Sequence, residues 1–307
     1  MIFITLIFFV LFLLSFFIYM REQLIISKTI SQQGNAIIIT YHDVLTNSDN
    51  KFYYTKPDKF IKQIMYFKKN NYEFLTLSEL YNKIINNIPL HKKTVVITFD
   101  GPYISWFNYV CPILKEHDIK ATFFVITSWV NTPGSITWQD FQGIKEYKNN
   151  AGTQLFDIQS HSDKHTSFMP LKSEDFKTFS NRINDELLAS KTKLDNNLNQ
   201  ETLYFALPYS RGMSNEMLDN IKCSGYLGVR TNRNSLISIK HDVLIFISQY
   251  SDFYLRSYMN FLYSINHFKT NIFLNYLLWF FVIVERAYIK IKYLRFKKKT
   301  QKTNGKN

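Results

Sequence analysis

The stretch TVVITFDGPYISW, from Thr94 to Trp106, decides the fold because it reads as a buried strand that ends on a carboxylate. Every residue of the strand before Asp100 is β-branched or aromatic, which is typical of a strand covered on both faces. Gly101 and Pro102 then supply a turn. Because parallel α/β sheets place their chemistry at the carboxyl ends of strands, Asp100 is the first candidate functional residue.

Six other segments share the β-branched and aromatic character of this strand. They are residues 36–42, 121–127, 155–162, 203–209, 226–231 and 243–249. Helical patterns separate several of them, namely apolar periodicity in 60–67 and 179–187, a capping-box pattern at Thr76 and Glu79, and the segment 107–117. This alternation predicts an α/β fold whose parallel sheet closes into a distorted (β/α)7-type barrel.

Four polar side chains fall at or just after the ends of predicted strands. They are His42, Asp100, His161 and Tyr209. A barrel would gather all four on one face. His161 and His165, in the segment SHSDKH, can converge on one metal ion if the residues between them form a helical turn or a tight loop. The alternative is a chance pair of histidines in a solvated loop.

Composition places the chain among folded globular proteins. At 307 residues, with 46% hydrophobic and 17% aromatic content, it can bury a full-sized core, which excludes a disordered chain. Its two cysteines, Cys111 and Cys223, lie far apart and show neither metal-site nor redox spacing. Both are therefore predicted to lie in the core.

Residues 1–22 are predicted to form a membrane anchor helix. Residues 2–20 are an almost unbroken apolar run that is long enough to cross a bilayer. Charged residues follow it where a cleaved signal would carry small ones, which favours an uncleaved anchor over a cleaved signal or a buried core helix. A linker over 23–35 leads to the barrel, which we expect to span 36–250.

After the barrel, residues 251–289 are predicted to form an apolar helical segment, and 290–307 form a basic tail. From Glu285 onward, nine Lys and Arg residues stand against that single Glu, so this end carries +8 of the formal net charge of +13. Such a tail suits anionic lipid headgroups or cytoplasmic retention, and no nucleic-acid partner is expected. The apolar segment either crosses the membrane again or lies in its interface or on the barrel.

The motifs resemble those of the polysaccharide deacetylases, carbohydrate esterase family 4 with its NodB-homology domain. That family carries T-F-D-D-G at a strand end, then H-[ST]-x-x-H, then R-x-P-[YF]. The counterparts here are TFDGP (98–102), HSDKH (161–165) and ALPY (206–209), in the same order, and the likeness runs from residue 36 to residue 250. The opening TYH and the missing arginine before Pro208 are most similar to the subgroup that de-N-acetylates poly-β-1,6-N-acetylglucosamine.

The resemblance implies a metal-dependent N-deacetylase of the NodB-like (β/α)7 type. Asp100 would be the general base, and His161 and His165 would bind a divalent metal, zinc, which activates water and polarises the carbonyl. Tyr209 and Pro208 would lie at the substrate, where the Tyr209 backbone N–H helps to hold the oxyanion. The implied partners are an acetylated amino-sugar polysaccharide, membrane lipid and the exopolysaccharide synthesis machinery, and the implied location is the outer side of the cell membrane.

Two departures from the family pattern concern the catalytic groups. Gly101 stands where the family has its metal-binding aspartate, and the nearest substitutes are Asp43 and Asp163, either of which can instead be a solvated or capping residue. The late L-x-H segment has no counterpart, so the sequence identifies no general acid. His42 either serves near the site or is a histidine hydrogen-bonded at a strand end. Two functions follow: an active deacetylase, or a catalytically impaired relative that binds glycan or assists its assembly.

Overall fold

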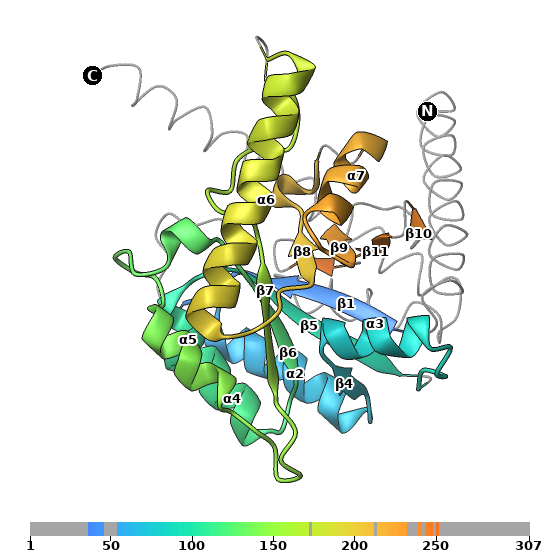
Figure 1. Cartoon of the computed structure of the whole chain (residues 1–307). Coiled ribbons are helices and arrows are strands. Elements are labelled where there is room, and N and C mark those ends of the chain that lie inside the picture. Colours follow the sequence, from blue (N-terminus) through green and yellow to red (C-terminus); the bar gives the residue numbers. More distant parts are fainter. Residues whose placement is uncertain are drawn as a thin grey trace, which may run out of the picture. The chain divides into compact units, whose positions relative to one another are not determined.

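The structure of the chain is a computed structural model that describes residues 36–45, 54–91, 93–171, 174–211, 214–231, 239–240, 243–247 and 250–251 (Figure 1). These residues belong to one compact unit, Thr29–Asp252. Within these ranges, no helix combines the length and the apolar character needed to cross a membrane. The predicted anchor and linker (1–35) and the predicted segment and tail beyond residue 251 lie outside the described residues.

A ten-stranded sheet forms the centre of the fold, in the order β10-β11-β9-β8-β7-β6-β5-β1-β12, with β4 paired to β5 off this path. All pairs are parallel except β10 with β11. The strands are β1 (Ala36–Tyr41), β4 (Glu73–Leu75), β5 (Thr94–Gly101), β6 (Ala121–Val125), β7 (Phe156–Ser160), β8 (Tyr204–Ala206), β9 (Gly228–Thr231), β10 (Ile239–Lys240), β11 (Val243–Ile247) and β12 (Tyr250–Ser251). A separate small sheet pairs β2 (Asp43–Val44) with β3 (Tyr54–Thr55).

All seven predicted strands are present, and the sheet is a parallel half-barrel. Among the described strands, no pairing between the two ends of the sheet closes it into a full barrel. The short strands β2, β3, β4, β10 and β12 were not predicted, because two or three residues are too few to show an alternating pattern.

The predicted helices are present as well. The helices are α2 (Pro57–Lys69), α3 (Leu77–Ile85), α4 (Cys111–Glu116), α5 (Trp138–Lys145), α6 (Phe176–Leu198) and α7 (Asn215–Cys223), with a π-helical turn over Trp106–Val110 and 3-10 turns over Thr127–Trp129 and Pro208–Ser210. Both halves of the predicted Thr76–Glu79 capping box form at the start of α3. Cys111 is buried as expected, but Cys223 is exposed, because it ends α7 on that helix's outer side.

Strand alternation explains which side chains meet at the top of the sheet. Val96, Phe124 and Ala206 belong to one buried apolar cluster on one face. Asp100 lies four residues after Val96 on β5, and its side chain is therefore on the same face. Arg230 of β9 is the register partner of Ala206 of β8, so its side chain is on this face as well. The apolar cluster thus continues, at the carboxyl ends of the strands, into a polar group on the same face.

Helix α6 covers the opposite face of this part of the sheet, and it also contacts α5 and α7 (Figure 1). Its buried residues Phe179, Ile183 and Leu187 pack in one cluster with Phe205 of β8 and Val229 of β9. Burial of each such side chain contributes on the order of 1.5–3 kcal/mol. This packing fixes the position of the helix that faces the histidine loop.

Leu187 and its neighbour Leu188 give a matched test of this packing, because Leu187 is fully buried and Leu188 is 49% exposed. We expect Leu187→Ala to lower the free energy of unfolding by about 2–5 kcal/mol, since it leaves a cavity. Leu188→Ala should change the same quantity by no more than about 0.5 kcal/mol. Urea unfolding followed by circular dichroism measures both, and equal losses would contradict the assigned face of α6.

Candidate active site

Asp100 and Arg230 form a buried ion pair at the carboxyl ends of β5 and β9. One Arg230 Nη donates to Asp100 Oδ1, and the two side chains are 0% and 4% exposed. The guanidinium also lies over the ring of Phe124, 5.1 Å from its centroid. The strand end that the sequence singled out therefore carries a carboxylate held by a cation from another strand.

Arg230 also decides the charge state of Asp100. Burial by itself would raise the pKa of Asp100, but the charge of Arg230 outweighs burial and brings the pKa below its ordinary value. Asp100 is therefore ionised at neutral pH. The same stabilisation of the charged form makes it a weaker base than an isolated buried carboxylate would be.

His161 and His165 lie together beside Asp100. Their ring centroids are 4.7 Å apart, and His161 Nε2 is 3.7 Å from Asp100 Oδ2. Burial lowers the pKa of His161 to about 4 and that of His165 to about 3, so both rings are neutral at pH 7. His161 and Asp100 therefore do not form an ion pair. A neutral imidazole lies close to the carboxylate instead.

The tautomer of His161 follows from its second ring nitrogen. Nδ1 lies 2.8 Å from the carbonyl oxygen of Ala206, an acceptor, so in the neutral ring Nδ1 carries the proton and donates to it. Nε2 then presents its lone pair toward Asp100. Metal-binding histidines have this arrangement, with one nitrogen fixed by a carbonyl and the other available.

Helix α6 holds the loop that carries the two histidines. The Glu186 carboxylate, 5% exposed, accepts hydrogen bonds from the backbone N–H groups of Asp163 and Lys164. Within the loop, Ser162 and His165 both have left-handed backbone conformations, with φ of 70° and 57°. Support from α6 offsets the cost of that tight conformation.

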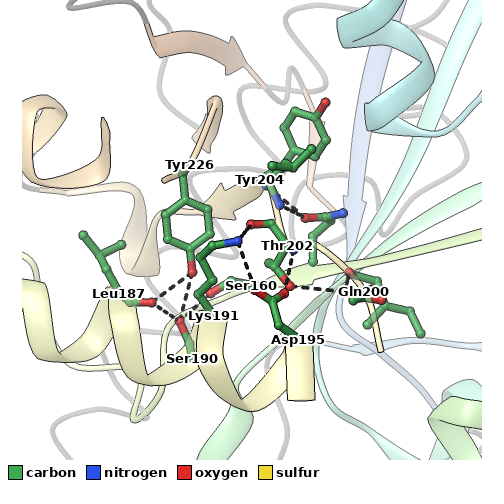
Figure 2. Close-up of polar contacts among 12 residues, drawn as sticks. Ser160, Leu187, Ser190, Lys191, Asp195, Gln200, Thr202, Tyr204 and Tyr226 are labelled. Carbon is green, nitrogen blue, oxygen red and sulfur yellow. Dashed lines mark hydrogen bonds and ion pairs between the residues drawn. The ribbon is translucent and has the colours of Figure 1, made fainter. Parts of the chain in front are cut away.

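A second group of contacts joins α6 to the end of β7 (Figure 2). The Ser160 hydroxyl is 2.7 Å from the Ser190 hydroxyl, and both Ser190 and Tyr226 donate to the carbonyl oxygen of Leu187. Lys191 bridges Asp195 and the carbonyl oxygen of Thr202 in the same view. Because Ser160 directly precedes His161, this network fixes the strand end from which the histidine loop departs.

His42 lies on the other side of Asp100. Its Nε2 is 4.0 Å from Asp100 Oδ2, and its side chain is 19% exposed. The buried Trp106 indole N–H donates to the carbonyl oxygen of His42 at 2.8 Å and so fixes the backbone there. His42 is therefore both near the carboxylate and open to solvent.

The two carboxylates proposed as substitute ligands have other partners. Asp43 accepts from the Ser105 hydroxyl at 2.7 Å. Asp163 accepts from the Thr127 hydroxyl and from Lys193 Nζ, each at 2.6 Å. Both are buried polar residues with structural hydrogen bonds.

Aromatic side chains border the histidines on the exposed side. Tyr209 is 61% exposed, and its ring centroid is 4.5 Å from that of His165. It has a left-handed backbone (φ 55°) in the turn that follows the buried Pro208. Trp129 is 38% exposed, with its ring centroid 5.9 Å from that of His165. The structure therefore brings His42, Asp100, both histidines and Tyr209 together as the sequence predicted.

These residues do not complete a divalent-metal site of the family's type. His161 and His165 fit two ligand positions, but among the described residues no three His, Cys, Asp or Glu side chains converge as a metal-binding group. Gly101 offers no donor, and a Cβ placed on it would lie 2.5 Å from the Tyr103 ring. Two neutral imidazoles without an anionic partner are a weak site for zinc.

Arg230 is the functional residue that sequence reasoning did not find. The clue in the sequence was the absence of the arginine of the R-x-P-[YF] motif, whose position is taken by Ala206. In the sheet, Ala206 is the register partner of Arg230. In the folded sheet, Arg230 of the neighbouring strand β9 reaches Asp100. No pattern within the linear sequence pairs positions 206 and 230, because strand register is set only by the folded sheet.

Comparison with known proteins agrees with this fold. Residues 87–229 match the polysaccharide deacetylase family model. The poly-β-1,6-N-acetyl-D-glucosamine N-deacetylase of Staphylococcus aureus (strain MRSA252) is 29% identical over 211 residues, which cover 63% of this chain and 71% of the relative. The Escherichia coli K12 protein of the same name is 24% identical over 152 residues, or 46% of this chain and 22% of that protein.

Solved structures show the same fold. The Streptococcus pyogenes deacetylase PplD in complex with acetate superimposes with a TM-score of 0.58 at 28% identity, over 69% of this chain and 91% of that one. IcaB from Ammonifex degensii, at 24% identity, has a TM-score of 0.57 with the same coverage. Residues 87–229 of the chain therefore form a polysaccharide deacetylase domain. The two curated relatives are named as N-deacetylases, and the matched domain is that of a polysaccharide deacetylase.

The Asp100–Arg230 pair can be tested by a double-mutant cycle. Arg230→Met leaves Asp100 as a buried carboxylate without its arginine, and we expect the free energy of unfolding to fall by about 3–5 kcal/mol. Asp100→Asn/Arg230→Met removes both charges and should lose much less than the two single variants together. Urea unfolding of the four proteins gives the coupling energy. Additive losses would show that the two side chains do not depend on each other.

Proposed function

We propose that the protein removes N-acetyl groups from a poly-β-1,6-N-acetylglucosamine-type polysaccharide. The observation that carries this proposal is the ionised Asp100, which lies between His42 and His161 at the open end of the sheet. The names of the relatives support the substrate class. An acetylated amino-sugar polymer is then the main partner of the site.

Asp100 is the general base in this proposal. It takes a proton from water while the water oxygen bonds to the acetyl carbonyl carbon, and the Tyr209 backbone N–H helps to hold the resulting oxyanion. The C–N bond then breaks, acetate leaves and the sugar nitrogen takes up a proton. His42 is the proposed donor of that proton, since it lies near Asp100 and is open to solvent.

The proposal includes two metal-binding histidines but not a complete metal site. A divalent metal would polarise the acetyl carbonyl and lower the pKa of water, and His161 and His165 would hold it. Because the third ligand of the family is missing, we derive no step through the metal. The expected consequence is slow turnover, to which the lowered pKa of Asp100 also contributes.

The proposed location is the outer side of the cell membrane, held by residues 1–22 and near the machinery that makes the polysaccharide. The apolar run at 2–20 and the basic residues after Glu285 support membrane lipid as a partner. A second candidate function is glycan binding without turnover. The specific observation in its favour is Gly101, which removes an anionic ligand.

Acetate release from β-1,6-linked N-acetylglucosamine oligomers tests the proposed activity. We expect Asp100→Asn to lower the rate roughly 100-fold or more, because the base is lost. Asp118→Asn is the matched control: this exposed aspartate has a left-handed backbone (φ 57°), which asparagine accepts readily. Saturable oligomer binding without any acetate release would instead favour the glycan-binding function.

Two substrates with different leaving groups distinguish a role of His42 as proton donor from a purely structural role. We expect His42→Gln to slow acetate release from the oligomers by roughly 100-fold, since the departing amine needs a proton. Hydrolysis of 4-nitrophenyl acetate should be little affected, because nitrophenolate leaves without protonation. Parallel losses on both substrates would show that His42 only maintains the site's structure.

A further inference from the structure

Gly101 provides no metal-binding side chain, and neighbouring side chains fill the space in which one would lie. A Cβ placed on Gly101 would lie 2.5 and 2.7 Å from two ring carbons of Tyr103 and 2.8 Å from a ring carbon of Trp106. These distances are shorter than a side-chain carbon tolerates, so something must move before any side chain can be placed there. The carboxylate that the family places at this point would therefore meet aromatic rings.

The two rings differ in how easily they can move. Trp106 is fully buried, packs against Phe99 and Phe123, and is hydrogen-bonded to the backbone of His42. Tyr103 is only partly buried, and it packs edge-on against Trp106 with ring centroids 6.0 Å apart. Tyr103 is therefore the side chain that can be shortened without dismantling the core.

The charges of the site also disfavour a bound divalent cation. Asp100 is already compensated by Arg230, and Asp163 is hydrogen-bonded to Lys193. A divalent cation held by His161 and His165 would add two positive charges close to Arg230, and among the described residues no further carboxylate joins the two histidines to balance them. Such an uncompensated charge in a buried site is costly.

We propose that Gly101 and Tyr103 act together as a closed third-ligand position, so that the natural chain binds zinc only weakly and regains a tight site only when both residues are changed. The inference deepens the proposed function, on which it rests, because it concerns the metal of the same site. Gly101→Asp restores the anionic oxygen, and Tyr103→Ala removes the two shorter of the three ring contacts, which leaves only a small shift of the Trp106 ring to be made. Neither change does both.

Zinc binding to the full chain, after chelator treatment, tests the inference without reference to activity. Isothermal titration with zinc chloride compares the natural chain, Gly101→Asp, Tyr103→Ala and the double variant. We expect the double variant to bind zinc roughly 100-fold more tightly than the other three, because the anionic ligand adds a strong charge–charge attraction. Equally tight binding by the natural chain, or full recovery with Gly101→Asp alone, would overturn the proposal.

A further variant shows whether the gained zinc lies at the intended place. Adding His161→Ala to the double variant should return zinc binding to the weak level, because it removes one of the two imidazole ligands. Retained tight binding would mean that zinc sits elsewhere, which would refute the closed position. Acetate release is measured separately, so that failure of the deacetylase activity and failure of the zinc comparison are distinguishable.

Closure can also be tested with no metal, which covers the case in which Gly101→Asp fails to fold. Gly101→Ala adds only the Cβ that meets the rings, and we expect it to lower the urea midpoint of unfolding. Gly101→Ala/Tyr103→Ala should recover part of that loss, measured against Tyr103→Ala alone. A midpoint for Gly101→Ala equal to that of the natural chain would show that the position is open.

Discussion

The contact between Asp100 and Arg230 is the constraint on which the rest of the site depends. The two residues lie on β5 and β9, with β6, β7 and β8 between them in the sheet. In a flat sheet with strands about 4.8 Å apart, β5 and β9 would be separated by roughly 19 Å, far beyond the reach of an arginine. Their direct hydrogen bond therefore requires the sheet to curl, and the half-barrel brings the carboxyl ends of these strands around one point.

The histidine loop depends on the helix behind the sheet rather than on the sheet alone. Glu186 accepts from two backbone N–H groups of the loop, and Lys193 of the same helix donates to Asp163. Ser160 joins the end of β7 to the same helix through Ser190 (Figure 2). Two imidazoles can then stay close together and neutral, although the backbone that carries them is in a left-handed conformation at two positions.

Loss of one carboxylate changes the electrostatics of the whole group. A family site balances a divalent cation and an arginine against two carboxylates, whereas here the described groups are one carboxylate and one arginine that neutralise each other. The site therefore needs no metal to compensate its charge, although His161 still presents a metal-binding nitrogen. This combination of retained imidazoles and a filled third position distinguishes the chain from the motif pattern of its family.

The sequence by itself determined seven of the strands, the order of the motifs and the resemblance to the polysaccharide deacetylases, because β-branched runs, capping boxes and the D-G-P and H-x-x-x-H segments are local patterns. It also showed that Gly101 occupies the position at which the family has a metal-binding aspartate. Only the tertiary structure decided that Arg230 holds Asp100, that Asp43 and Asp163 are committed to other partners, and that Tyr103 and Trp106 fill the space beside Gly101. Strand register and ring packing join residues far apart in the chain, and neither leaves a periodic trace in the sequence.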